Sequence, residues 1–543
     1  MKINKKFELC IILETSLISK PIFDLIEFLK NHSDLSVSYI LIPMSSKNNF
    51  IQAPFLKNFM SILSQIGWRI IKFFENLYYR RFYSDSSKYL INITNDELIL
   101  DLRESFSLEM EISLSNQSIL GKRKIDLMLA LNLNQCCYLL KQFSKFGLIS
   151  LDHFDPENKS YRPLGFKEVF MKKGNTGFSI LRLKKDIDII EILFQGAFPT
   201  HNYFLANHFN ILKRRNFYIK KYILLILHDS LMRNSIKLNR MPSLINLEKS
   251  PTLFEQIIYV YSLFVQRFKS IKNKILKRQK FWSVGFVYSD WENLCKAEVN
   301  VIKNFNHCYL ADPFIIRANE KNYCFAEEYN FDTLKGSIVA YELKDKSSIR
   351  IGKIIDESFH MSFPYLFKFQ EKIFMIPETS ENNDIRIYES LEFPHQWKLN
   401  QVLMSDVFAV DSMIFQHKEK WWLFTNINPE GGSEACSELY IFSSNNPLSK
   451  NWKPHLLNPV IVDSNSARNG GILYKNNKVF RVSQKQNFGR YGAEFSINEI
   501  LKLTENDFIE RRIKQVKPNF ISNGLATHHC HSNSDITVFD FLT

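Results

Sequence analysis

Acidic side chains recur at equivalent places of a repeated pattern in the second half of the chain. They are Asp312, Glu327, Glu378 and Asp411. Two of them, Asp312 and Asp411, stand in a predicted strand, and the other two end the strand that follows. Carboxyl groups that lie close to one another can act as general acid and base. Acids at strand ends also cap turns or pair with a nearby arginine, so a structural role stays open for each.

The pattern that positions these acids is an apolar strand, a short polar turn and a second apolar strand that ends in a polar residue. Its clear copies align on residues that are 51, 48 and 59 positions apart, namely Pro313, Pro364, Ser412 and Gly471. A degenerate fifth copy begins at Thr527 and ends near Asp540. Repeats of about 40–50 residues with several strands each are typical of propeller blades. The repeat therefore predicts an all-β, five-bladed β-propeller.

The inner strands of a propeller converge on one axis, so like positions of the repeat meet at one end of it. We therefore expect the four acids to be catalytic candidates in one axial site. The substrate-binding candidates around them are His360, Arg468, Gln484, His528 and Trp421. Aromatic rings such as Trp421 bind sugars by stacking. Carboxylates with aromatic rings suit plain sugar binding as well as catalysis, and residue types alone do not separate the two.

Histidines cluster at His528-His529-Cys530-His531. Adjacent side chains of a strand point to opposite faces, so at most two of these residues could share one ion. We expect structural histidines near the axis and predict no metal site.

The composition of the 543 residues is that of a folded, multidomain protein, with 45% hydrophobic and 23% charged residues. The net charge of +14 comes partly from basic stretches near Lys213 and Arg267, without a nucleic-acid-binding motif. Eight cysteines without a CxxC spacing suit reduced thiols. No signal peptide or transmembrane run is recognised. We expect a cytoplasmic protein that binds no nucleic acid.

Three regions follow from the pattern along the chain. Residues 1–210 alternate strand-like and helix-like segments, which favours a parallel-sheet α/β domain. Residues 211–280 are predicted to form a basic helical linker, and residues 281–543 form the propeller. Apolar positions at helical spacing mark one face of the linker: Ile257, Tyr261, Phe264, Phe268, Ile271 and Ile275. This face either packs on a neighbour or contacts an anionic membrane peripherally, at its inner, cytoplasmic side.

The N-terminal region resembles the formyltransferase family. Gly147 to Asp155, then Arg162 to Glu168, Thr176-Gly177 and Ile187-Asp188 follow the order and spacing of that family's core. The resemblance implies a Rossmann-like domain whose site positions are Ser150, Asp152, His153 and Asp188. Only Asp188 matches the family's chemistry, because Ser150 stands at its Asn position and Asp152 at its His position. The cofactor is therefore unknown, and 10-formyltetrahydrofolate is expected only if formyl transfer is retained.

The C-terminal region is similar to the N-terminal domain of plant glucosamine inositolphosphorylceramide transferases and its bacterial relatives. The similarity is carried by short sequence motifs, which include Ala311-Asp-Pro-Phe314, Glu327-Glu328, His360-Met-Ser-Phe-Pro364, Pro377-Glu-Thr-Ser380, Trp421-Trp422, Ala467-Arg468 and Tyr491-Gly492. The resemblance implies a propeller like that of five-bladed glycosidases, in which two carboxyls lie about 5–10 Å apart. In it, Asp312 or Asp411 would be base or nucleophile, and Glu327 or Glu378 the acid.

Three functions are compatible with these features. The first is an enzyme of surface-polysaccharide or glycolipid assembly that transfers or modifies a glycosyl unit, with a sugar or nucleotide-sugar as substrate. The second is an N-formyltransferase acting on a nucleotide amino sugar. The third is a carbohydrate-binding or assembly protein without catalysis.

Overall fold

The computed structural model describes residues 6–13, 17–41, 55–79, 88–90, 120–131, 140–153, 163–185, 190–228, 236–238, 250–275, 281–431 and 434–543. The contacts within the chain divide it into two compact units, Met1–Ile271 and Lys272–Thr543. The second predicted boundary, between residues 280 and 281, lies close to this division. Within the described residues, no helix combines the length and the apolar character needed to span a bilayer.

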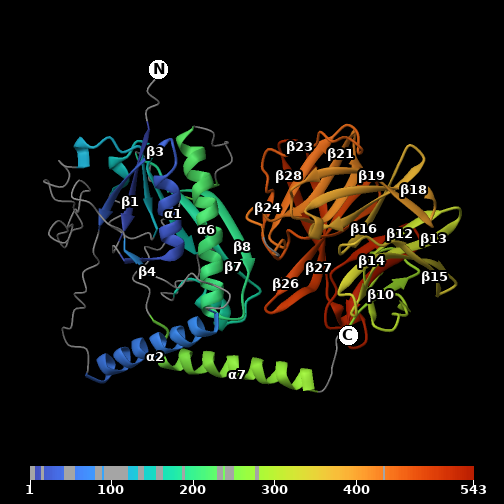
Figure 1. Cartoon of the computed structure of the whole chain (residues 1–543), viewed down its shortest axis with the longest axis horizontal. Coiled ribbons are helices and arrows are strands. Elements are labelled where there is room, and N and C mark those ends of the chain that lie inside the picture. Colours follow the sequence, from blue (N-terminus) through green and yellow to red (C-terminus); the bar gives the residue numbers. More distant parts are fainter. Residues whose placement is uncertain are drawn as a thin grey trace. The chain divides into compact units, whose positions relative to one another are not determined.

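The N-terminal unit is built on a mixed sheet with the strand order β3-β1-β5-β6-β7-β8-β9 (Figure 1). Its strands are β1 (Phe7–Leu13), β3 (Leu35–Leu41), β5 (Leu127–Ala130), β6 (Leu148–His153), β7 (Asn175–Leu183), β8 (Ile190–Pro199) and β9 (Ile236–Leu238). The strands from β3 to β6 are parallel, and those from β6 to β9 are antiparallel. The predicted parallel sheet is therefore correct for one half only, because an apolar run does not encode strand direction.

Several helices accompany this sheet. They are α1 (Lys20–Lys30), α2 (Phe55–Tyr79), α5 (Phe166–Phe170), α6 (Phe204–Leu227) and α7 (Leu253–Ile275), with the short 3₁₀-helix η3 (Lys141–Phe143). α1 has Pro21 in its first turn, where no backbone N–H is needed. α6 packs on α1 and on β7. A separate two-stranded antiparallel sheet pairs β2 (Leu17–Ser19) with β4 (Lys88–Leu90).

Two expectations for this region need correction. Residues 211–280 were predicted to form a basic helical linker, but β9 within this range adds an edge strand to the sheet. Residues 211–227 belong to α6, whose side chains are largely buried against the sheet. A helix that covers the face of a sheet has the same apolar periodicity as a linker helix, so the sequence pattern does not separate the two.

The C-terminal unit contains the five predicted blades, each a sheet of antiparallel strands. Blade 1 comprises β12 (Cys308–Ala318), β13 (Lys321–Asn330), β14 (Lys335–Lys344) and β15 (Ser347–Ile355). Blade 2 comprises β16 (Ser362–Phe369), β17 (Lys372–Thr379), β18 (Asp384–Glu392) and β19 (Gln396–Ser405), with η4 (Ser380–Asn382). Blade 3 comprises β20 (Ala409–His417), β21 (Lys420–Ile427), β22 (Glu438–Ser444), β23 (Lys453–Pro454) and β24 (Ile461–Val462). Blade 4 comprises β25 (Asn469–Lys475), β26 (Lys478–Asn487), β27 (Arg490–Leu503) and β28 (Phe508–Val516), followed by η5 (Pro518–Phe520).

Blade 5 closes the ring with strands from both ends of the unit. It pairs β10 (Trp282–Val287) and β11 (Asn300–Ile302) with β29 (Cys530–Ser532) and β30 (Thr537–Leu542). The innermost strands β12, β16, β20, β25 and β29 contact one another in this order, and β29 returns to β12. This arrangement confirms the five-bladed propeller. The fifth repeat looked degenerate because half of its blade lies more than two hundred positions earlier in the sequence.

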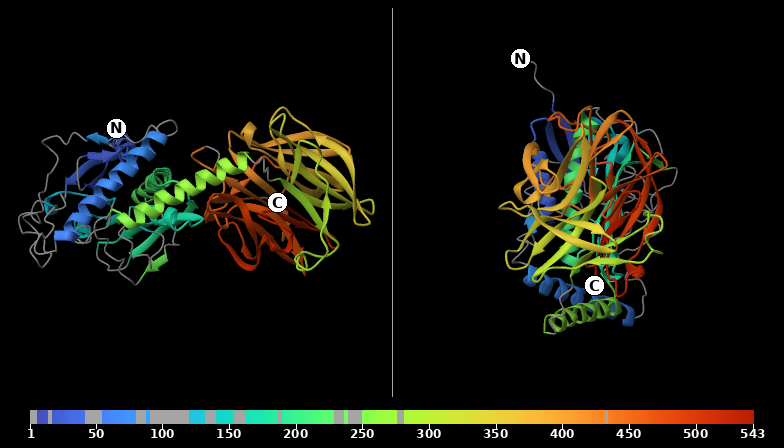
Figure 2. Two further views of the ribbon diagram at one scale, coloured as in Figure 1. Left: turned by 90° about the horizontal axis from the view of Figure 1, so that it is seen from below. Right: turned by 90° about the vertical axis from the view of Figure 1, so that its right-hand side faces the viewer.

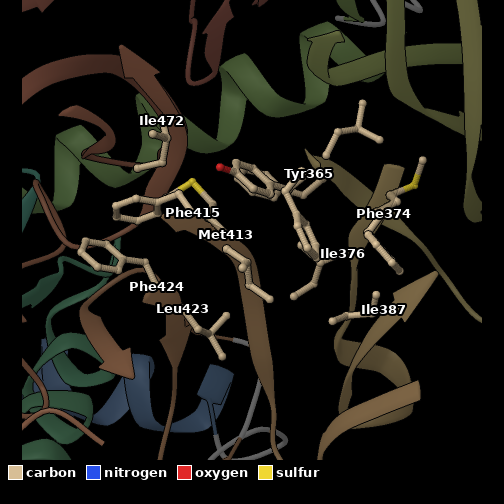
Figure 3. Packing of buried hydrophobic residues seen from close by; sticks show 14 of the residues in the cluster. Tyr365, Phe374, Ile376, Ile387, Met413, Phe415, Leu423, Phe424 and Ile472 are labelled. Atoms are coloured by element: carbon tan, nitrogen blue, oxygen red, sulfur yellow. The ribbon is translucent and has the colours of Figure 1, made fainter. Parts of the chain in front are cut away.

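Blades pack against each other through apolar side chains that alternate along the strands. Figure 3 shows Tyr365 and Ile376 of blade 2 facing Met413 of blade 3, with Leu423 and Ile472 nearby. Full burial of a side chain of this size stabilises a fold by about 1.5–3 kcal/mol. Apolar packing between the blades therefore contributes much of the stability of the ring.

Candidate functional site

A β-bulge interrupts the innermost strand of four blades at the same place. The pairing register shifts between Ala311 and Phe314, Ser362 and Tyr365, Val410 and Met413, and Asn469 and Ile472. Three of these bulges hold a non-glycine residue at positive φ, namely Asp312 (50°), Phe363 (47°) and Asp411 (50°). Such backbone strain costs about 1–3 kcal/mol per residue and concentrates at functional sites. A bulge also re-aims its side chain, and the repeat thus directs Asp312 and Asp411 to the axis.

The four predicted acids come together at this end of the axis. Glu327 pairs with Ala311 and Glu378 pairs with Ser362, so each glutamate stands beside a bulge. All four acids are buried. Burial, reinforced by the carboxylates of Asp312 and Glu378, raises the pKa of Glu327 well above its usual value. This shift favours the protonated form of Glu327, which is the form that a general acid requires.

His360 contacts Glu327 from the edge of the site. Its Nε2 lies 3.6 Å from Oε1 of Glu327. The N–H of Gly336 donates to its Nδ1 at 2.9 Å, so the ring proton of the neutral imidazole sits on Nε2 and faces the carboxyl. Burial lowers the pKa of His360, which favours this neutral form. A Cβ at Gly336 would lie 2.8 Å from both Glu327 and His360, so only glycine permits this approach.

A second group surrounds Asp411. Arg468 donates to both of its carboxylate oxygens, from Nε at 2.6 Å and from Nη2 at 3.3 Å, and Gln484 donates from Nε2 at 2.9 Å. Arg468 Nη2 also lies 3.9 Å from Glu378. Burial raises the pKa of Asp411 to about 8, although Arg468 opposes this shift. Asp411 is thus held in one orientation, with both oxygens engaged.

A third group joins blade 5 to blade 1. His528 Nε2 lies 3.2 Å from Asp312 Oδ1, and its Nδ1 lies 3.0 Å from Asp540 Oδ1. Burial alone would lower the pKa of His528, but Asp540 and Asp312 outweigh it and raise the pKa to about 10. Asp540 also accepts from the backbone N–H groups of Asp312, His528 and His529. His528 is therefore an imidazolium between two carboxylates.

The protonation of His528 predicts a pH-dependent stability. The folded state holds the proton with a pKa of about 10, against 6.5 for the free side chain, so the stabilisation is complete below about pH 6.5 and is lost as the pH rises toward 10. We expect the free energy of unfolding to fall by about 1.4 kcal/mol per pH unit within this window relative to a His528→Gln variant. Urea unfolding at several pH values measures this difference. The exposed His395 supplies a matched control, and a His528→Gln profile parallel to that of His395→Gln would contradict the assignment.

Tyr491 lies between the groups around Asp411 and His528. Its ring lies 4.9 Å from the guanidinium of Arg468 and 5.2 Å from the ring of His528, and it is 42% exposed. The predicted stacking residue, Trp421, is buried and packs on Phe367 and Phe369. Trp421 pairs with Gln416 beside the β20–β21 turn, at the end of the strand away from Asp411. Residue types alone do not indicate which end of a strand lies at the axial site, so the sequence did not show that Trp421 lies at the opposite end from Asp411.

Asp540 is a further residue of this cluster, and the sequence analysis did not single it out as a site residue. One sequence feature could have identified it: Asp540 stands between Phe539 and Phe541 in the apolar strand Thr537–Leu542. An acid in such a strand is rarely buried unless it has polar or charged partners. Asp312, His528 and Asp540 each have a ligand atom within 4.8 Å of the others and could in principle hold a metal ion. Both ring nitrogens of His528 already face a carboxylate, so an ion would have to displace its proton.

The formyltransferase-like positions are only partly described. Ser150 is fully buried within the sheet, and its hydroxyl has no hydrogen-bond partner among the described residues. Positions 152 and 153 lie in β6, which pairs with β7 without a register shift, so the described strand has no bulge to bring position 153 to the face of position 152. The side chains of Asp152 and His153, and the whole of Asp188, lie outside the described residues.

Fold and site together define a five-bladed β-propeller with a buried acidic centre at its axis. Residues 293–535 match the family model described as the N-terminal domain of glucosamine inositolphosphorylceramide transferase 1. Proteins of that name from Arabidopsis thaliana and Oryza sativa subsp. japonica are each 32% identical to the chain, over 282 and 231 residues. These alignments cover 46% and 41% of this chain, and 36% and 31% of the plant proteins. The chain thus spans about a third of the length of these relatives.

Two solved structures are similar to the chain at low sequence identity. They are a family 117 glycoside hydrolase of Zobellia galactanivorans, with a TM-score of 0.33 and 11% identity, and an α-L-arabinofuranosidase of Coprinopsis cinerea, with a TM-score of 0.33 and 10% identity. The similar regions cover 48% and 43% of this chain and 90% of each of those chains.

Proposed function

We propose that the protein is a carbohydrate-active transferase of glycolipid or surface-polysaccharide assembly, and that it binds a sugar unit at the propeller axis. One observation carries the proposal. Five buried acids surround two cations, Arg468 and His528, beside the half-exposed ring of Tyr491. Five carboxyls exceed two cations, and the pKa values of Glu327 and Asp411 are raised, which favours their protonated forms. A proton-holding acid next to an aromatic ring suits a sugar hydroxyl or glycosidic oxygen.

The residues would divide the chemistry as follows. Glu327 is the proposed general acid, because burial and its acidic neighbours keep it protonated. Asp312 is the proposed base or nucleophile, since its strained backbone aims it at the axis. Asp411, bound through both oxygens by Arg468 and Gln484, is better suited to hold sugar-binding groups in place. Glu378 accepts a hydrogen bond from the hydroxyl of Ser380 at 2.7 Å and is the fourth of the proposed acidic residues of the site.

The proposed substrates are a sugar or nucleotide-sugar donor and a lipid-linked acceptor. Support comes from the 32% identity with plant proteins named as glucosamine inositolphosphorylceramide transferases. The matching family model covers residues 293–535, which include Asp312, Glu327, Glu378 and Asp411. A cytoplasmic location stays a prediction, with which the unpaired thiols among the described cysteines are compatible.

Thermal unfolding with a panel of nucleotide-sugars, free sugars and folates tests the proposal. A ligand present at 100 times its Kd stabilises the folded state by about 2.7 kcal/mol. We expect a sugar-type ligand to raise the melting temperature of the wild type, and Asp312→Asn to abolish or weaken the shift. Asp535→Asn, in an exposed ion pair with Arg317, is the matched control.

Other outcomes would favour the two remaining functions. A folate response that is indifferent to Asp312→Asn would place the activity in the N-terminal unit as formyl transfer and overturn the proposal. Sugar binding that survives Asp312→Asn and Glu327→Gln unchanged, without turnover, would favour a carbohydrate-binding protein that lacks catalysis.

A further inference from the structure

Two helices of the N-terminal unit, α2 and α7, form a pair that is fixed along one side. Gln256 of α7 donates to the carbonyl of Ser64 at 2.7 Å, and Tyr259 of α7 donates to Glu75 of α2. Glu75 in turn accepts from the N–H of Leu205 in α6 at 2.8 Å, and the ring of Trp68 packs on Phe204 at 4.9 Å. These contacts hold the inner sides of both helices. Seen from below, the pair lies in front of the N-terminal sheet (Figure 2).

The outer sides of both helices expose large apolar side chains. On α2 they are Phe59, Met60, Ile62, Ile66, Ile70, Phe73, Phe74, Leu77 and Tyr78, and on α7 they are Phe254, Ile257, Ile258, Tyr261, Phe264, Phe268 and Ile271. At about 100° per residue, each set falls on one face of its helix. Exposed apolar surface this continuous marks an interaction site. We call this set of residues the apolar platform.

The charges around the apolar platform are of one sign. Each helix contains a single acid: Glu75 is buried against Tyr259, and Glu255 caps the start of α7 by accepting from Thr252. The exposed charged residues of the two helices, among those with described side chains, are basic and include Arg69, Arg267 and Lys269. By helical spacing they lie beside the apolar stripes, where long basic side chains reach past buried apolar groups to a polar surface.

We propose that the apolar platform docks the protein on the surface of an anionic phospholipid bilayer, with its apolar side chains between the lipid headgroups. Interfacial helices have this combination of a wide apolar face and flanking basic residues, and anionic lipids attract those residues. A second copy of the chain fits less well. In a symmetric dimer the same patch meets itself, which would bring these basic residues together without acidic partners. This proposal is independent of the sugar chemistry at the propeller.

Vesicle flotation of the full chain tests the proposal. The probes are vesicles of phosphatidylglycerol and phosphatidylcholine in equal parts, and vesicles of phosphatidylcholine alone. We expect binding to the mixed vesicles, and a loss of about tenfold or more in the double variant Phe264→Gln/Phe268→Gln, because two large apolar groups no longer enter the interface. The matched control is Leu334→Gln/Leu391→Gln, which changes two exposed apolar residues of the propeller. Thermal unfolding checks that each variant is folded.

The charge variants and the oligomeric state complete the test. Arg69→Gln/Lys269→Gln is expected to weaken binding to the mixed vesicles severalfold, whereas Lys398→Gln/Lys418→Gln on the propeller is not. Equal binding of the wild type to neutral and mixed vesicles would overturn the anionic preference. The whole proposal is overturned if the wild type floats with neither vesicle and sediments as a dimer that Phe264→Gln/Phe268→Gln converts to a monomer.

Discussion

An Asp540→Ala variant is expected to lose about 3–5 kcal/mol of propeller stability. Asp540 is fully buried, and it accepts three backbone N–H groups and faces the His528 imidazolium. The substitution leaves a buried cation with one carboxylate and three buried donors without an acceptor. Because the contact with the N–H of Asp312 joins blade 5 to blade 1, the loss acts where the ring closes.

Urea unfolding followed by tryptophan fluorescence measures this loss. Six of the seven tryptophans lie in the propeller unit, namely Trp282, Trp291, Trp397, Trp421, Trp422 and Trp452. Asp540→Asn keeps one acceptor oxygen and is expected to lose less, about 1–3 kcal/mol. Asp535→Ala breaks an exposed ion pair and is expected to change stability by no more than about 1 kcal/mol. An Asp540→Ala variant as stable as Asp535→Ala would show that His528 is not held as an imidazolium.

The spacing of the repeat predicted the axial site because a propeller converts sequence period into spatial proximity. Asp312 and Asp411 are far apart in sequence but occupy the same bulge of two innermost strands. The same reasoning placed Glu327 and Glu378, each of which lies on the second strand of a hairpin whose first strand carries a bulge. The bulges themselves were not predictable, since a left-handed residue in a strand depends on the packing around it. They explain why acids in a buried strand point to the axis.

The parts that sequence reasoning missed depend on contacts between distant segments. Asp540 acquires its role only when β30 pairs with β10 at the other end of the unit. Tyr491 belongs to one of the motifs that carry the family similarity, but its position between Arg468 and His528 follows from the packing of the blades. In the N-terminal unit, residues 1–210 were expected to alternate strands and helices, and the apolar run at Leu148–His153 does form a strand. The antiparallel direction of β7 to β9 is set by their connections, which an apolar run does not encode.

Loss of Arg468 is expected to have a comparable effect at the other side of the site. Arg468→Met removes two of the three side-chain donors to Asp411 and leaves only Gln484; it also removes the cation that lies 3.9 Å from Glu378. We expect a loss of about 3–5 kcal/mol well above pH 8, where Asp411 of the wild type is ionised beside Arg468. The loss should be smaller near pH 5.5, where Asp411 keeps a proton in the folded state, since its folded pKa lies above the value of 3.8 for the free side chain.

A double-mutant cycle separates this pair from ordinary loss of packing. Asp411→Asn retains an acceptor for Gln484 and removes the charge, so the double variant Arg468→Met/Asp411→Asn should be more stable than Arg468→Met alone. The exposed pair Arg317–Asp535 is the control, and Arg317→Met should change stability by about 1 kcal/mol or less. If the second substitution in the cycle restores nothing, Arg468 acts through its contact with Tyr491 and not through charge. If it restores stability but sugar binding stays lost, the charged Asp411 itself is needed to hold the ligand.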